Sequence, residues 1–82
     1  MNVSETDFKY MREFIIRDMA YFLTQDFNMT MEQALRAVYN SHTLTVLDNA
    51  ETGFYYQSPR YVYNYLKDEL VNGKFNPHPR FS

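Results

Sequence analysis

The chain lacks cysteine and tryptophan, has two glycines and three prolines, and contains no long apolar run. Without cysteine, neither disulfides nor a cysteine-based zinc site can stabilise the fold. No segment approaches the ~20 apolar residues of a membrane span. The first residues show neither the basic region nor the apolar core of a signal peptide. We therefore expect a cytoplasmic protein that does not enter a membrane.

Residues suited to chemistry are equally scarce. The two histidines, His42 and His78, lie far apart in the sequence, whereas a zinc site needs three or four ligands. Gly53 and Gly73 are too few and too distant to build a phosphate-binding loop. Ser41 directly precedes His42, which is not how a serine nucleophile normally meets its base. We expect no metal, no cofactor and no catalytic residue, and interpret the protein as a non-enzyme.

The charges are nearly balanced, with a formal net charge of −2 and a pI of about 5.5. Lysines and arginines are scattered, each near a carboxylate, whereas nucleic-acid binding requires a basic surface that displaces counterions from phosphates. This pattern argues against a nucleic-acid partner and against an anionic membrane surface. Carboxylates such as Asp68 and Glu69 are interpreted as ordinary solvated groups.

Aromatic residues are abundant: seven Phe and eight Tyr make up 18% of only 82 residues. A domain of this length buries roughly 60–65% of the surface that its unfolded chain exposes. Each aromatic side chain can remove about 150–250 Å² from water, so the rings must supply much of the core. Fifteen rings nevertheless exceed the available interior. We expect some of them to lie on a surface that meets another protein.

A first helix is predicted over residues 7–25, capped by Ser4 or Thr6. Its apolar residues form two ridges at about 100° per residue, where a lone surface helix needs only one. Such a helix is either flanked on two sides by its own chain or packs against a second copy. The core ridge contains Phe8, Met11, Ile15, Met19 and Phe22, and the second ridge contains Tyr10, Phe14 and Tyr21.

Thr30 and Gln33 form a capping box that starts a second helix, which should fade around 40–41. Ser58 and Pro59 start the last helix, and Asn72-Gly73 ends it. Tyr61 and Tyr65, one turn apart on that helix, should touch. The expected core stripes are Met31, Ala34, Leu35 and Val38 in the second helix and Val62, Leu66 and Leu70 in the last.

The stretch between these helices is ambiguous. Leu44 and Leu47 have helical spacing, which favours a short helix at about 43–48, capped by Ser41 or Thr43. The alternative is a hairpin over 43–57, which would make the fold α+β. We predict an all-α domain over 1–73, a compact orthogonal bundle of three main helices plus one short helix. An extended tail, 74–82, follows because two prolines prevent a helix there.

The predicted function is protein–protein interaction, as a homodimer or with a neighbouring gene product. The alternative is a small transcriptional regulator with a helix-turn-helix, since the second and third helices have roughly that spacing. However, residues 43–48 carry no Arg, Lys, Asn or Gln to contact bases. The candidate partner-binding residues are Tyr10, Phe14, Tyr21, Tyr55, Tyr56, Tyr61 and Tyr65.

One pattern runs through residues 8–72: Met29-Thr30-x-x-Gln33-Ala34-Leu35-x-x-Val38-Tyr39, then Ser41-x-Thr43-x-x-x-Leu47, then Thr52-Gly53-x-Tyr55-x-Gln57-Ser58-x-x-Tyr61-Val62-x-x-x-Leu66. With this pattern the chain resembles a group of short bacterial proteins of unknown function, often encoded beside ADP-ribosyltransferase-like toxins. The resemblance implies a small helical accessory, an antitoxin or another toxin-operon component, with no catalytic residue to transfer.

Overall fold

The structure, a computed structural model, describes residues 4–79 of the chain. Within that range there is no strand, so the predicted all-α fold is confirmed and the hairpin alternative at 43–57 is wrong. The elements are α1 (Glu5–Asp26), α2 (Met31–Tyr39), α3 (His42–Asp48), the 3₁₀ turns η1 (Ala50–Thr52) and η2 (Phe54–Tyr56), and α4 (Pro59–Asn72). Three main helices and a short one are the elements that the sequence predicts.

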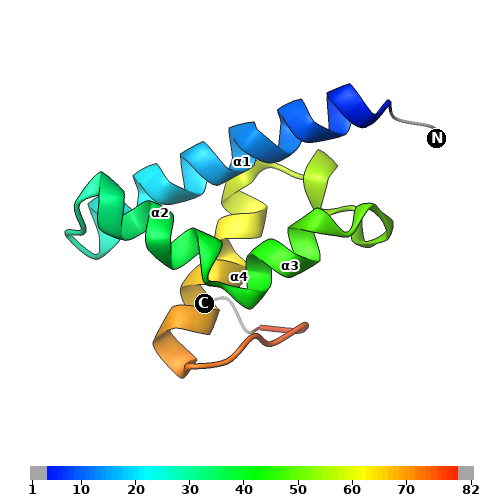
Figure 1. Cartoon of the computed structure of the whole chain (residues 1–82). Coiled ribbons are helices and arrows are strands. Elements are labelled where there is room, and N and C mark those ends of the chain that lie inside the picture. The colour runs from blue at the N-terminus through cyan, green and yellow to red at the C-terminus, as the bar shows by residue number, and fades with distance from the viewer. Residues whose placement is uncertain (1–3, 80–82) are drawn as a thin grey trace.

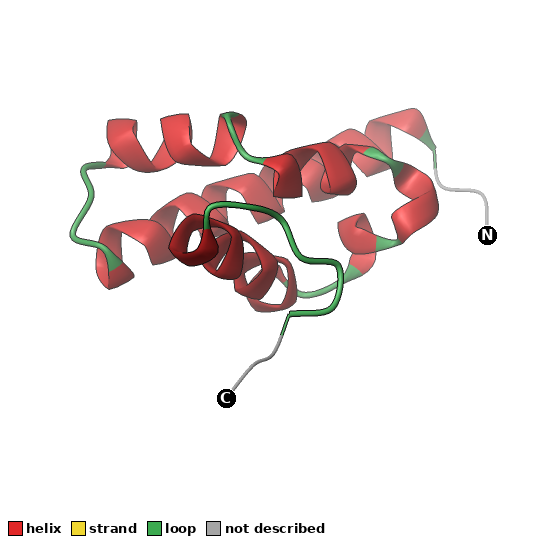
Figure 2. Cartoon of the chain, turned by 90° about the horizontal axis from the view of Figure 1, so that it is seen from below, coloured by secondary structure: helices red, strands yellow, loops and turns green. Residues whose placement is uncertain are grey.

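The long helix α1 lies along one edge of the molecule, and the other elements gather on one side of it (Figure 1). After a sharp turn α2 runs back beside α1, while α4 crosses α1 steeply (Figures 1 and 2). Both α2 and α4 contact α1, and α3 contacts α4. Two neighbours from its own chain therefore contact α1, but both lie on its core side, and its second apolar ridge stays exposed. The opposite side of α1 faces away from these neighbours.

The helix starts follow the local sequence signals. The Ser4 hydroxyl accepts from the Asp7 amide at 3.1 Å, so Ser4 is the cap of α1. The predicted capping box of α2 is complete, with Thr30 and Gln33 each accepting from the backbone N–H of the other at 3.1 and 3.0 Å. At α4, Ser58 accepts from the Tyr61 amide at 3.2 Å. These side chains replace bonds that the first turn of a helix cannot make internally.

The short helix α3 and its exit also follow from identifiable residues. The Ser41 hydroxyl accepts from the Leu44 amide at 3.1 Å and donates to the Val38 carbonyl at 2.6 Å. The first of these bonds caps α3, and the second fixes the corner between α2 and α3. Gly53 then adopts a φ of 75°, a left-handed conformation that glycine tolerates best. The chain therefore turns sharply between η1 and η2 and returns toward the core.

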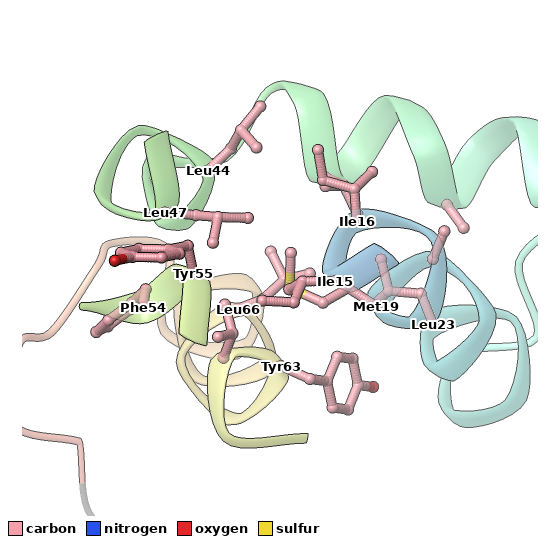
Figure 3. Packing of buried hydrophobic residues seen from close by; sticks show 14 residues of the cluster. Ile15, Ile16, Met19, Leu23, Leu44, Leu47, Phe54, Tyr55, Tyr63 and Leu66 are labelled. Carbon is pink, nitrogen blue, oxygen red and sulfur yellow. The ribbon is translucent and has the colours of Figure 1, made fainter. Parts of the chain in front are cut away.

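The core lies where α1 meets α2, α3, η2 and α4 (Figure 3). Ile15 and Met19 of α1 point toward Leu66 of α4, with Tyr63 beside them. The buried apolar residues are Ile15, Ile16, Met19, Ala20, Leu23, Ala34, Val38, Leu44, Leu47, Phe54, Tyr55, Val62, Tyr63 and Leu66.

Three residues expected in the core stripes are on the surface instead. Met11 is 36% exposed, Met31 44% and Leu70 36%. Met31 and Leu70 are the first and last residues of their stripes, whereas Met11 lies between Phe8 and Ile15, both of which are more buried. Helical periodicity gives the face on which a residue lies, but not how far along that face the neighbour extends.

The described part of the tail, 74–79, contains no helix and folds back on the domain. The Phe75 ring stacks on Tyr65 with centroids 5.8 Å apart and contacts the His42 ring at 4.9 Å. The tail therefore covers the junction of α3 and α4. Phe81, whose docking the sequence leaves open, lies outside the described residues.

Candidate protein-binding surface

An aromatic stripe, defined here as Tyr10, Phe14 and Tyr21, runs along the outward face of α1. The three positions fall within a narrow sector of the helix at 100° per residue, on the side away from Met19. Tyr10 is 77% exposed, and Phe14 and Tyr21 are each 53% exposed. The stripe extends over about 16 Å at 1.5 Å per residue. The predicted second ridge of the helix is therefore present and faces solvent.

The surroundings of the aromatic stripe are partly charged. Arg17 is exposed in the gap between Phe14 and Tyr21, with Glu13 one turn before it. Tyr21 contacts the Phe22 ring edge-on, with centroids 6.2 Å apart, which connects the end of the stripe to the packed interior. The stripe thus combines three rings with one cation on a rigid helix, a composition typical of binding surfaces.

A second set of rings surrounds the start of α4, and most of it is used within the chain. Phe54 contacts Tyr61 and Tyr65 at centroid distances of 5.8 and 4.8 Å. Tyr61 and Tyr65 touch as predicted, at 5.5 Å, and Phe75 completes the stack. The hydrogen bond with Tyr61 and burial raise the pKa of Tyr65 to about 12. We call Phe54, Tyr61, Tyr65 and Phe75 the α4 ring cluster.

Tyr55 and Tyr56, neighbours in η2, have opposite environments. Tyr55 is 9% exposed and packs on Phe8 at 5.1 Å, so its expected place on a partner-binding surface is wrong. Tyr56 is 62% exposed and lies against Gly53, where a Cβ would come within 2.8 Å of its hydroxyl oxygen. The turn at Gly53 decides which of the two rings faces inward.

A polar contact joins α4 to the end of α1. The buried Tyr63 hydroxyl donates to the Asp26 carboxylate at 2.6 Å, and the Lys67 amine lies 3.6 Å from the same oxygen. Burial raises the pKa of Tyr63, and its bond to Asp26 adds to this shift. The same bond lowers the pKa of Asp26. Arg60 covers the Phe22 ring at 3.9 Å. These groups hold the two helices together.

Glu69 has a structural role that its sequence context does not reveal. Its carboxylate accepts from the amides of His42 and Thr43 at 2.8 and 2.9 Å and from the Thr43 hydroxyl at 2.7 Å. The expectation of an ordinary solvated carboxylate is therefore wrong for Glu69. The negative charge occupies the positive end of α3, a favourable place for it. Thr43 and His42 lie 26 and 27 residues before Glu69 in the chain, so no local sequence pattern indicates this contact.

Some exposed rings lie outside the aromatic stripe. Tyr39, on α2, is 51% exposed, although it directly follows the buried Val38. Periodicity alone does not separate an edge position from a covered one. Among residues 4–79, the Phe and Tyr rings exposed by more than a third are Tyr10, Phe14, Tyr21, Phe27, Tyr39, Tyr56 and Tyr61.

Other kinds of site find little support in the part of the chain that the structure describes. Among residues 4–79, no three His, Asp or Glu side chains come together in a group that could hold a metal ion. Over the same range, no helix has both the length and the hydropathy that crossing a bilayer requires.

No protein-family model, no curated protein and no solved structure matches this chain. The resemblance to toxin-associated bacterial proteins therefore stays a prediction. Function must be inferred from the surface itself.

Proposed function

We propose that this chain is a non-enzymatic protein–protein interaction module that binds its partner through the aromatic stripe. The observation that carries the proposal is the alignment of Tyr10, Phe14 and Tyr21 on the outward face of α1. Large rings supply contact area at low entropic cost, and Tyr is enriched at the centres of interfaces. A helix held by contacts with both α2 and α4 presents these rings in a fixed geometry, which reduces the ordering cost of binding.

The resemblance noted in the sequence suggests one class of partner, a toxin encoded nearby. In that case the module would act as an antitoxin or as another accessory of the toxin operon. The aromatic stripe would then bind a complementary apolar surface on the toxin.

The helix-turn-helix alternative is less favoured by the local electrostatics. A phosphate approaching the start of α3 would meet the Glu69 carboxylate, which already accepts from His42 and Thr43. At the other end of α3, Asp48 is paired with Arg12, so that arginine is engaged. Glu69 would thus repel a phosphate at the start of α3, and Arg12 is not free to bind one at its end.

The proposal is tested by affinity capture with a tagged chain. Three proteins are compared: the wild type, a stripe variant with Tyr10→Ser, Phe14→Ser and Tyr21→Ser, and the control Tyr39→Ser, which removes a ring of similar exposure from α2. Circular dichroism first checks that all three fold. A protein captured by the wild type and the control, but lost with the stripe variant, is the expected result. Identical capture by all three would contradict the proposal.

A gel-shift assay at low salt addresses the alternative function. We expect no shift. A salt-sensitive shift that Arg36→Ala weakens would favour a nucleic-acid-binding protein instead, because phosphate contacts lose affinity as salt rises. Arg36 suits this test because it is exposed, and its ion pair with Glu32, one helical turn before it at 3.1 Å, is exposed as well.

A further inference from the structure

We propose that the aromatic stripe binds the same stripe of a second copy of this chain, with the two α1 helices antiparallel. This inference rests on the proposed function and specifies its partner. It commits to a symmetric dimer, in which one patch must complement itself.

The spacing of the stripe supports self-pairing. In an antiparallel pair, residues equidistant from the midpoint on opposite sides face each other. Tyr10 and Tyr21 are equidistant from the point between Ile15 and Ile16, and so are Phe14 and Arg17. The helix Glu5–Asp26 has the same midpoint. The register that pairs the rings therefore also overlaps the two helices along their full length, about 33 Å.

The charges are compatible with this register. Arg17 comes opposite Phe14 of the second copy, where a guanidinium over a ring is favourable. Glu13 lies on the same flank of the stripe as Arg17, and the two sit at nearly equal height across the pair. The Glu13 carboxylate, which pairs with Arg12 of its own helix at 2.9 Å, could then be shared with Arg17 of the second copy. Antiparallel macrodipoles also attract weakly. A parallel pair would instead place Arg17 opposite Arg17 of the second copy. The antiparallel arrangement thus places Arg17, the exposed cation between Phe14 and Tyr21, opposite complementary groups of the second copy.

The available area sets the expected strength. At the observed exposures, the three rings offer roughly 350 Å² per chain, taking about 200 Å² for each aromatic side chain. Flanking side chains add to this area. A standard specific interface buries about 800 Å² per partner, so the area available here lies toward the low end. We therefore expect a reversible dimer that dissociates on dilution.

The first experiment measures mass by analytical ultracentrifugation from low to high micromolar concentration. The full chain should shift from monomer toward dimer as concentration rises. Tyr10→Ser or Tyr21→Ser should weaken association at least about tenfold. Tyr39→Ser, on α2, should leave it unchanged.

The second experiment reads the direction of pairing. The chain has no cysteine, so single cysteines can be introduced without background. Asp7→Cys and Gln25→Cys are suitable, since both positions are exposed, lie on the same flank of the stripe and leave its rings intact. In the proposed dimer, position 7 of one copy lies beside position 25 of the other. Position 7 is about 25 Å along the axis from position 7 of the second copy.

The cross-linker is a short bis-maleimide that spans about 10 Å, the width of one helix. A mixture of the two variants should yield covalent dimer, and each variant alone should not. Cross-linking of either variant with itself would overturn the antiparallel arrangement. A chain that stays monomeric at every concentration would overturn self-association altogether. In that event the interaction function is judged by the capture experiment, so failure of this inference and failure of the function are distinguishable.

Discussion

The aromatic stripe of α1 and the α4 ring cluster hold similar residues, yet every ring of the stripe is more than half exposed, whereas in the cluster only Tyr61 is exposed by more than a third. In the cluster, Phe54 is 8% exposed and its ring contacts both Tyr61 and Tyr65. In the stripe, Tyr10, Phe14 and Tyr21 are 53–77% exposed along one face of α1. The difference does not come from composition. It comes from the elements that follow: η2 and the tail fold over α4, whereas α2 and α4 both occupy the other side of α1.

This contrast separates two uses of a ring. A ring that meets three others stabilises the fold, and a ring that meets solvent is available for binding. The same substitution should therefore have opposite consequences in the two regions. Stability and association are the two measurements that distinguish them.

The largest expected effect is on stability in the α4 ring cluster. Phe54→Ala should lower the free energy of unfolding by about 3–5 kcal/mol, because it leaves a cavity among packed rings. Phe14→Ala, in the stripe, should change it by no more than about 0.5 kcal/mol. Urea denaturation of both variants checks this difference. Equal losses of unfolding free energy in the two variants would show that Phe14 is part of the packed fold and would contradict the contrast between the stripe and the cluster.

Removing the Glu69 carboxylate should have the next largest effect. Glu69→Ala leaves the first amides of α3 without their acceptor and should cost about 2–3 kcal/mol. Glu51→Ala, which removes an exposed carboxylate from η1, is the matched control and should be nearly neutral. Denaturation curves of the two variants, compared with the wild type, provide the measurement. A neutral Glu69→Ala would mean that water caps α3 equally well.

A smaller effect is expected at the contact between α1 and α4. Tyr63→Phe keeps the buried ring and removes only the bond to Asp26, so it should cost about 1–2 kcal/mol. Thermal unfolding at neutral pH measures this loss. An unchanged midpoint would show that the Lys67 amine alone satisfies Asp26.

The same contact predicts how stability changes with pH. The pKa of Asp26 is lowered in the folded state, so the unfolded chain binds its proton first and stability falls as pH drops below about 4. The pKa of Tyr63 is raised, so its contribution is complete below about pH 10 and is lost as pH rises further. Tyr63→Phe should flatten the alkaline limb and reduce the acid limb in urea titrations. Unchanged limbs would contradict this assignment.

The smallest expected effect is at the tail. Phe75→Ala removes the ring stacked on Tyr65 and should cost about 0.5–1 kcal/mol. Amide hydrogen exchange should show faster exchange near His42 and Tyr65 in the variant, with no change along α1. Faster exchange over the whole chain would show that the tail is part of the global core.

Much of the fold could be predicted because its signals are local. Ser4, Thr30 with Gln33, and Ser58 each cap the helix that their sequence context predicts. The short helix α3 also follows from the spacing of Leu44 and Leu47, both of which are buried. In each case the deciding interaction lies within four residues of chain. Helix periodicity likewise gave the two ridges of α1.

The rest depends on contacts between distant segments. Glu69 caps α3 from α4, and no nearby residue indicates this. Tyr55 and Tyr56 are neighbours with similar side chains, so only the three-dimensional turn at Gly53 decides which is buried. Of the candidate surface, the sequence correctly separated the stripe from the core ridge of α1. It did not show that folding would cover Tyr55 and nearly cover Tyr65.

The Glu69 contact also bears on the order of folding. A seven-residue helix such as α3 is too short to persist on its own in water. Its capping carboxylate arrives only with α4, whose residues emerge later along the chain. The α3 helix should therefore consolidate late, after α4 has docked, and Thr43 should show a low φ-value in refolding kinetics. During synthesis, the N-terminal half would then remain incomplete until the last helix is available.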